Sequence, residues 1–227
     1  MLRLYIGNKN YSSWSMRPWV LMKQTGIAFD EVRVPFDSFA PDSKFKTAMR
    51  GVTPVGAVPV LVDGGFSVWD SLAIAEYLAE KFPEKQLWPQ SAQARARARS
   101  ICAEMHGGFG ALRNICGFNV EAELPQIGQI ALRDQPTLRA EMQRICAMWG
   151  ELLSEHGGPM LFGGFSIADA YFAPVCLRIH TYALPVPAPI AAYLARVRAL
   201  TGVAAWIADA MAEHEFIAFE EPYRAAR

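Results

Sequence analysis

The segment TPVGAVPVLVDGGFSVWDSLAIAEYL occupies residues 53–78 and carries the strongest structural signal in the chain. It places a Val-Pro pair at the start of an apolar strand and follows that strand with an Asp-Gly-Gly turn at 63–65, which is typical of a β-hairpin. Apolar residues then recur at helical spacing over 70–82. The segment therefore predicts two antiparallel strands followed by a helix.

The residues before this segment extend the pattern. A short strand at 2–7 leads through a Ser/Asn-rich turn to a helix at about 15–25, which a glycine ends. An alternating strand follows at 30–36 and a short helix at 41–51. The predicted order is βαβαββα, so we expect an α/β domain over residues 1–82.

The texture of the sequence changes after this domain. Two prolines and several polar residues over 83–93 indicate a linker. The remainder, 94–227, shows helical periodicity with almost no strand signal and predicts an all-α domain. The expected helices lie near 92–116, 122–133, 135–156, 166–183, 187–200 and 203–213.

Composition excludes several classes of partner. The 227 residues are 52% hydrophobic, which suffices for a core, and the 22 basic residues balance the 22 acidic ones. Zero net charge disfavours nucleic acid and anionic membrane surfaces, and no apolar run approaches the roughly 20 residues of a membrane span. The four cysteines are widely separated, which indicates buried thiols in the cytoplasm and neither a disulfide framework nor a metal site.

The segment 53–78, together with the turn NYSSWSMR at 10–17, resembles the glutathione transferase family. The resemblance implies a thioredoxin-like N-terminal domain, a helical-bundle C-terminal domain, and glutathione as co-substrate without a metal. It also implies a cytoplasmic homodimer whose two-fold axis lies between domain 1 of one subunit and domain 2 of the other.

The resemblance assigns four residues to glutathione. In the family, the proline matching Pro59 follows a cis peptide bond, which turns the preceding backbone outward. Val58 and Pro59 would then hold the cysteinyl part of glutathione as an extended peptide. Ser71, at a helix start, would bind the γ-glutamyl carboxylate, and Asp70 would assist there. The plainer alternatives are an edge-strand proline and an ordinary helix N-cap.

The turn at 10–17 supplies the candidate catalytic residue. It resembles the Ser-Ser-Cys-Ser-x-Arg signature of zeta-class transferases and the Ser-Pro-x-x-x-Arg signature of tau-class ones, and both alignments, counted back from Arg17, give Ser12 as the catalytic hydroxyl. A thiol of pKa about 8.5 is mostly protonated at neutral pH, so a hydroxyl and a helix N-terminus would stabilise the thiolate. Ser13 is its rival. Trp14 replaces the zeta cysteine, which argues against zeta-specific isomerase chemistry.

Other residues are assigned more loosely by the same resemblance. Lys44 aligns approximately with a position that contacts the glycine end of glutathione, and Lys46 could serve instead, while a solvated surface lysine is the alternative. His106, Phe109 and Arg113 have roughly helical spacing and would either line the acceptor pocket or pack between helices.

The segment FSIAD at 165–169 matches the family's capping box, with Ser166 as N-cap and Asp169 as its partner. We expect this segment to stabilise the helix that follows it, without a role in the reaction.

The implied function is a glutathione transferase that adds the glutathione thiolate to a hydrophobic electrophile. Glutathione-dependent isomerisation or peroxide reduction would use the same sulfur. The lack of cysteine at 12–15 argues against thiol transfer through a mixed disulfide. The alternative from another class is a non-catalytic module that keeps the scaffold for binding or protein interaction; the presence of Ser12, Pro59, Asp70 and Ser71 favours catalysis.

Overall fold

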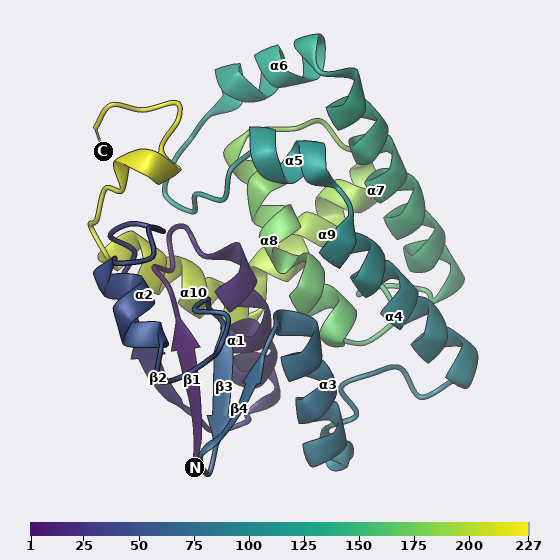
Figure 1. Cartoon of the computed structure of the whole chain (residues 1–227). Coiled ribbons are helices and arrows are strands. Elements are labelled where there is room, and N and C mark those ends of the chain that lie inside the picture. The colour runs from purple at the N-terminus through teal and green to yellow at the C-terminus, as the bar shows by residue number, and fades with distance from the viewer. Residues whose placement is uncertain (227) are drawn as a thin grey trace.

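The computed structural model describes residues 1–226 and confirms the predicted fold class, a thioredoxin-like domain followed by a helical domain (Figure 1). Its sheet has the strand order β2-β1-β3-β4. Strand β1 runs parallel to β2 and antiparallel to β3, and β3 pairs antiparallel with β4 across the predicted turn. The strands are β1 (Leu2–Ile6), β2 (Asp30–Arg33), β3 (Val60–Asp63) and β4 (Phe66–Trp69).

Three helices complete this domain in the predicted βαβαββα order, namely α1 (Ser13–Thr25), α2 (Lys44–Met49) and α3 (Ser71–Lys81). The two-residue period of the strands distributes them over the sheet faces. Leu61 packs into the large core with α1 and α3, whereas its neighbours Val60 and Val62 pack with α2. The sheet therefore lies between α2 on one face and α1 with α3 on the other.

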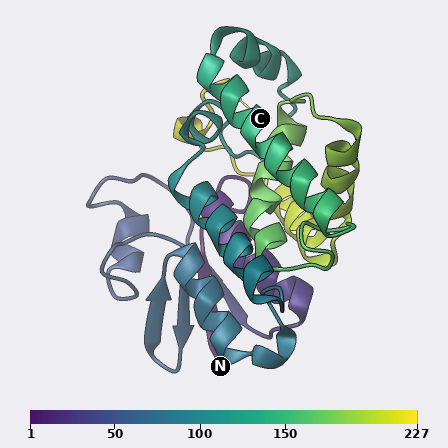
Figure 2. The same ribbon diagram turned by 90° about the vertical axis from the view of Figure 1, so that its right-hand side faces the viewer.

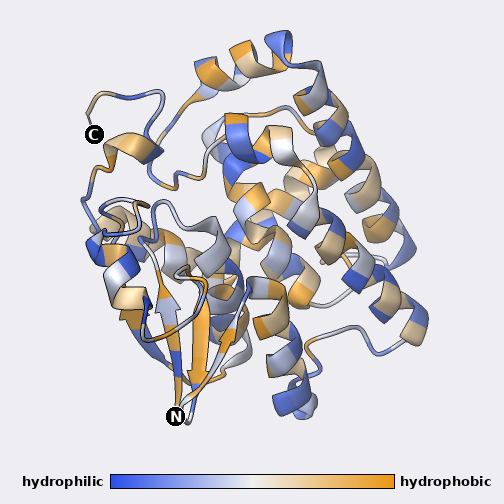
Figure 3. Ribbon diagram, in the orientation of Figure 1, coloured by the Kyte–Doolittle hydropathy of each residue, from blue (hydrophilic) through white to orange (hydrophobic). Residues whose placement is uncertain are grey.

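The helical domain surrounds one buried helix, α8. Of its 15 residues, only His180 is not buried, so it forms the centre of the bundle. Figure 3 shows hydrophobic residues along the strands and mixed colouring on the outer helices. The helices are α4 (Ala92–Gly107), α5 (Gly110–Ile115), α6 (Pro125–Asp134), α7 (Pro136–Glu155), α8 (Ile167–Thr181), α9 (Ala188–Ala199) and α10 (Thr201–Ala212), with short 3-10 turns η1 (Pro83–Lys85) and η2 (Ala218–Glu220).

The single helix predicted at 92–116 is wrong, because the chain forms two helices there. A side chain at Gly108 would meet the carbonyl oxygen of Glu104 at 2.6 Å, and Phe109 has a left-handed φ of 53°. The helix therefore ends and restarts in a new direction. The strand predicted at 30–36 is also too long, since β2 ends two residues before Pro35.

The two domains share one hydrophobic core through α1, as the side view indicates (Figure 2). The Trp19 ring lies 5.3 Å from that of Trp206 on α10. A side chain at Gly202 would lie 3.0 Å from the backbone oxygen of Val20, so α10 approaches α1 closely. The domain division at 82 and 93 stays a prediction, and residue 227 of the expected second domain lies outside the described residues.

Two sequence-based expectations concern thiols and membranes. The four cysteines are free: Cys102, Cys116 and Cys176 are buried and Cys146 is half-buried. Burial raises the pKa of all four thiols. Over residues 1–226 no single helix is both long and apolar enough to cross a bilayer; α9 and α10 reach that length only together, across a bend of 71°.

The predicted capping box is present at the start of α8. The fully buried Asp169 carboxylate accepts hydrogen bonds from the backbone N–H of Ser166 at 2.9 Å and of Leu161 at 3.1 Å. It also accepts from the Ser166 hydroxyl at 3.2 Å and the Tyr193 hydroxyl at 3.0 Å. Burial raises the Asp169 pKa to about 6, so the group is ionised at neutral pH. Four donors therefore surround one carboxylate.

Asp169→Asn should lower the free energy of unfolding at pH 7 by about 3 kcal/mol or more, because a charged acceptor is lost and an amide N–H₂ faces donors. Urea denaturation followed by circular dichroism measures this. Asp134→Asn, at an exposed ion pair with Arg133, is the matched control and should change stability by less than about 0.5 kcal/mol. Equal stability of the two variants would contradict the role given to Asp169.

Candidate active site

Two cavities adjoin where the sheet domain meets the helical domain. Their walls share Trp14, Ala57 and Val58. We call the one of ≈ 320 Å³ the Ser12 cavity and the one of ≈ 350 Å³ the Ser71 cavity. A molecule that extends past Val58 can reach both.

The Ser71 cavity is built on the start of α3. Asp70 is the N-cap, and its Oδ1 accepts hydrogen bonds from the N–H of Leu72 at 2.8 Å and of Ala73 at 3.3 Å. Asp70 has a φ of 76°, a strained value for a residue other than glycine. Over residues 1–226 the N–H of Ser71 donates to no other group. The helix start therefore presents a free donor with the positive end of the helix dipole.

Two residues of the helical domain, Tyr171 and His106, complete a ring of polar contacts with Asp70 and Ser71 at the start of α3. The Ser71 hydroxyl lies 3.1 Å from the Tyr171 hydroxyl, which lies 2.6 Å from Nδ1 of His106. Nε2 of His106 lies 3.2 Å from Oδ2 of Asp70. His106 thus lies at the Ser71 cavity, while the Phe109 side chain is buried in the core.

Val58 and Pro59 lie between the two sites, and the peptide bond that joins them is cis. Pro59 is buried and directly precedes β3, whereas Val58 is only half-buried. Within the described part of the chain, neither the N–H nor the C=O of Val58 has a hydrogen-bond partner. An extended peptide lying along the cavities could pair with both groups.

The Ser12 cavity takes its walls from both domains. The sheet domain contributes the serine turn, a cluster of phenylalanines and one lysine, and the helical domain contributes two arginines, an aromatic ring and a carboxylate. The lining residues outside the shared wall are Tyr11, Ser12, Ser13, Phe36, Phe39, Phe45, Lys46, Arg113, Gly117, Phe118, Arg178 and Glu220. The predicted candidates Ser12, Ser13 and Arg113 therefore meet at one site.

The two candidate hydroxyls have different partners. Ser12 is the N-cap of α1 by position, but its side chain makes no capping bond. Its Oγ lies 2.7 Å from Oγ of the buried Ser15, which accepts a hydrogen bond from the N–H of Gly7 at 3.2 Å. Oγ of Ser13 accepts a hydrogen bond from Nη2 of Arg178 at 3.3 Å. Both hydroxyls line the cavity at the N-terminus of α1.

The two lysine candidates separate clearly. Lys44 is exposed and lines neither cavity. Lys46 lines the Ser12 cavity, and its ammonium group donates to the carbonyl of Gly56 at 2.8 Å. The sequence pattern alone left this choice open, because both lysines lie in the first turn of the same short helix.

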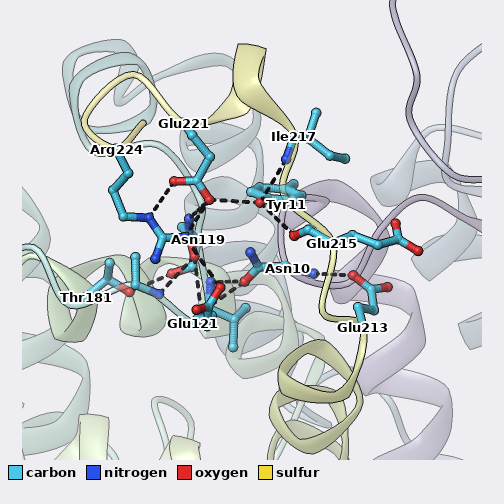
Figure 4. A network of polar contacts seen from close by, with 12 residues as sticks. Asn10, Tyr11, Asn119, Glu121, Thr181, Glu213, Glu215, Ile217, Glu221 and Arg224 are labelled. Carbon is cyan, nitrogen blue, oxygen red and sulfur yellow. Dashed lines mark hydrogen bonds and ion pairs between the residues drawn. The ribbon is translucent and has the colours of Figure 1, made fainter. Parts of the chain in front are cut away.

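The C-terminal segment holds the serine turn in place through contacts that no local sequence pattern indicates (Figure 4). The Tyr11 hydroxyl donates to Glu221 at 2.8 Å and accepts from the N–H of Ile217 at 3.3 Å. Glu221 is also bound by Nδ2 of Asn119 at 2.7 Å and by the Arg224 guanidinium. Burial, together with the bond to Glu221, raises the Tyr11 pKa to about 12, so this hydroxyl keeps its proton.

Neighbouring residues extend this attachment. Glu213 accepts hydrogen bonds from the backbone N–H of Lys9 at 2.7 Å and of Asn10 at 3.2 Å. Oδ1 of Asn10 accepts from the N–H groups of Val120 and Glu121 at 2.9 Å each. The turn that carries Ser12 is therefore tied to two separate segments of the helical domain.

Comparisons with known proteins agree with this architecture. Residues 8–86 match the family model for the glutathione S-transferase N-terminal domain, and residues 92–209 match the model for its C-terminal domain. Glutathione S-transferase 1 of Dianthus caryophyllus is 28% identical over 175 residues, which are 76% of this chain and 75% of that protein. Maleylacetoacetate isomerase of Rattus norvegicus is 31% identical over 126 residues, 56% of this chain and 54% of that protein.

A solved structure of a glutathione transferase homologue is also similar to this chain. A glutathione transferase homologue from Burkholderia, crystallised with bound glutathione, is similar with a TM-score of 0.65 and 25% identity, covering 93% of this chain and 98% of that one. The two matched domain models span most of the sequence, and both describe the same family. The chain belongs to the glutathione S-transferase family.

Proposed function

We propose that this protein binds glutathione, stabilises its thiolate with a serine hydroxyl at the start of α1, and transfers it to an electrophilic small molecule. The observation that carries the proposal is the position of Val58, whose free backbone groups lie in the shared wall of the Ser12 and Ser71 cavities. The glutathione bound in the Burkholderia homologue supports it.

Glutathione fits this arrangement as an extended peptide. The γ-glutamyl carboxylate is taken by the N–H and hydroxyl of Ser71 at the positive end of α3, with Asp70 fixing the helix start. The cysteinyl residue pairs with the backbone of Val58. The glycine carboxylate is taken by Lys46, which we prefer to Lys44 because only Lys46 lines the Ser12 cavity.

The cysteinyl sulfur then lies toward the serine turn. Ser12 donates its proton to the thiolate once its contact with Ser15 reverses, with the Ser15 hydroxyl as donor. The α1 N-terminus adds the positive end of its dipole. Ser13, which accepts from Arg178, is the alternative activator.

The reaction is nucleophilic transfer. The thiolate forms a carbon–sulfur bond to the acceptor, and the leaving group departs with the electron pair. Phe36, Phe39, Phe45 and Phe118 give the Ser12 cavity apolar walls suited to a hydrophobic acceptor. Isomerisation, named for the rat relative, would use the same thiolate and a different acceptor. The competing proposal is a non-catalytic binding module.

We also propose a homodimer in the cytoplasm, where thiols are kept reduced. Phe66 lies on the edge strand β4 and is 63% exposed, which suits an interface with a second copy.

Ser12→Ala should lower kcat by about 10² or more, as for loss of one donor to a developing or stabilised anion, and should raise the thiol pKa of bound glutathione toward its free value. Ultraviolet absorbance of the thiolate, a conjugation assay and calorimetry measure pKa, kcat and Kd. Affinity for glutathione should change little. Ser100→Ala, on the exposed face of α4, is the control.

Ser13→Ala decides between the two hydroxyls. If Ser13→Ala abolishes turnover and Ser12→Ala does not, Ser13 is the activator and the assignment to Ser12 is wrong. If wild-type protein does not bind glutathione at all, the non-catalytic module replaces the whole proposal.

Tyr171→Phe should weaken glutathione binding about 3- to 10-fold, because the Ser71 hydroxyl and His106 lose one shared hydrogen-bond partner. Isothermal calorimetry gives the Kd. Tyr77→Phe removes another tyrosine hydroxyl, which donates to Asp63 at 2.7 Å away from both cavities, and should leave the Kd unchanged. A wild-type Kd for Tyr171→Phe would mean that the ring does not support Ser71.

Phe66→Glu should convert a dimer to monomers of 25.1 kDa in sedimentation velocity, since a charge on the edge strand opposes burial of that face. Ile130→Glu, at another exposed apolar side chain on α6, is the control. A monomeric wild-type protein would contradict the proposed dimer.

A further inference from the structure

Three arginines lie close to the Ser12 cavity or in its wall. The Arg17 guanidinium lies 3.9 Å from the centroid of the Trp14 ring and that of Arg113 lies 5.5 Å from it. Arg178 donates to Ser13 at 3.3 Å and lines the cavity together with Arg113. Arg17 is buried beside Trp14 and lines neither cavity, so Arg113 and Arg178 are the two that a bound molecule can meet.

These arginines have donors without partners. Within residues 1–226, the buried atoms without a hydrogen-bond partner include Nη1 and Nη2 of Arg17, Nε of Arg113 and Nη1 of Arg178. No carboxylate of the described chain lies within 4 Å of any of the three groups. Burying a charge without a partner costs several kcal/mol. Aromatic faces compensate only part of that cost.

Several other arginines of the described residues have carboxylate partners. Arg99 binds Glu76, Arg144 binds Glu104 and Arg224 binds Glu221 through ion pairs of 2.6 to 2.7 Å. Arg198 also has a buried Nε without a hydrogen-bond partner, but it lines neither cavity. Arg113 and Arg178 differ from these arginines because they line the Ser12 cavity and have no ion-pair partner in the described part of the chain.

Burial and repulsion act on Arg17 and Arg178 without discharging them. Burial, with a smaller contribution from neighbouring guanidinium groups, lowers the pKa of Arg17 to about 10 and that of Arg178 to about 9. Both groups are thus still protonated at neutral pH. The cavity keeps its positive charge under assay conditions.

The remaining charges that line the cavity do not cancel the arginines. Lys46 adds a third cation to Arg113 and Arg178 in the lining. Among the described residues of this lining, Glu220 on η2 is the one carboxylate, and burial raises its pKa. Lys46 is taken by the glycine carboxylate of glutathione in the proposed pose, so Arg113 and Arg178 remain, and Glu220 forms an ion pair with neither of them.

Glutathione in the proposed pose does not use these groups. Its two carboxylates are taken by Ser71 and Lys46, and its thiolate faces the serine turn. Arg113 and Arg178 belong to the helical domain and lie on the acceptor side of the cavity. An acceptor with an anionic group would meet these two guanidinium groups where they line the cavity.

We propose that the acceptor substrate is a carboxylic acid, whose carboxylate binds Arg113 and Arg178 while its apolar body packs on the phenylalanines of the Ser12 cavity. This inference rests on the proposed function. A guanidinium binds a carboxylate through charge-assisted hydrogen bonds, which are stronger than neutral ones. The same contact fixes the orientation of the electrophilic carbon toward the sulfur.

The test compares two acceptors that differ in one charge, 4-chloro-3-nitrobenzoate and its methyl ester. In both, the glutathione thiolate forms a carbon–sulfur bond and chloride leaves with its electron pair. Each kcat/KM is divided by the rate constant of the uncatalysed reaction with glutathione, which removes the difference in intrinsic reactivity. The acid should exceed the ester at least about tenfold, as expected for one charge-assisted contact.

Variants assign the preference to residues. Arg113→Met and Arg178→Met should each lower the acid-to-ester ratio about tenfold, and Glu220→Gln should raise it because a repelling carboxylate is removed. Because Arg178 is buried, Arg178→Met can fail to fold; Arg113→Met and Glu220→Gln then carry the test. Arg133→Met, on the exposed end of α6, is the control and should leave the ratio unchanged.

Three outcomes overturn the inference. The first is an ester preference that Arg113→Met does not alter. The second is an equal loss with both acceptors together with a higher thiol pKa, which would assign the arginines to the sulfur. The third is benzoate binding no more tightly than benzyl alcohol to the protein loaded with S-methylglutathione. That calorimetric arm needs no turnover, so it separates failure of this inference from failure of catalysis.

Discussion

The burial of α1 between the sheet and the helical bundle is the constraint on which the rest of the structure depends. The helix packs on β1 and α3 on one side and on α8 and α10 on the other, and a side chain at Gly202, where α10 crosses it, would lie only 3.0 Å from the backbone oxygen of Val20. Its first residues therefore cannot shift relative to either domain without opening a cavity in the shared core. Ser12 and Ser13 lie at the start of this doubly held element, so their hydroxyls are placed by packing rather than by the turn alone.

Helix α8 packs against α1 and carries a residue that contacts Ser71, so the packing of α1 also affects the Ser71 cavity. Arg178 follows Tyr171 by seven residues, which is about two turns and ~10 Å along the axis, so both side chains face the sheet domain. One contacts Ser71 at the start of α3 and the other contacts Ser13 at the start of α1. A single buried helix thus spans the two ends of the cavity. The Asp169 capping box fixes where this helix begins, which links a folding element to the geometry of the site.

The features of this structure that depend on residues close together in the sequence were predictable. The hairpin turn, the capping box of α8 and the Val-Pro pair before β3 depend on neighbours within a few residues, and their positions were predicted correctly from the sequence. The partners of the site were not predictable in the same way, because Tyr171, Arg178 and Glu221 reach Ser71, Ser13 and Tyr11 across more than 90 residues. Helical spacing also failed at Gly108, where the break sends His106 to one cavity and Arg113 to the other. Which of two nearby lysines faces inward depended on the path of a short helix, and periodicity does not determine that path.

Because of how η2 is attached, substitutions beside the Ser12 cavity and substitutions in the hydrophobic core have separate effects. This turn is held by side chains such as Glu221 and Arg224 and lies outside the shared core. Glu220 lines the Ser12 cavity, and the Phe219 ring lies 5.2 Å from that of Phe39, another lining residue. Substitutions at these two positions can remodel the mouth without disturbing the hydrophobic core or the Ser71 cavity. The mouth of this cavity can therefore vary independently of the packed scaffold beneath it.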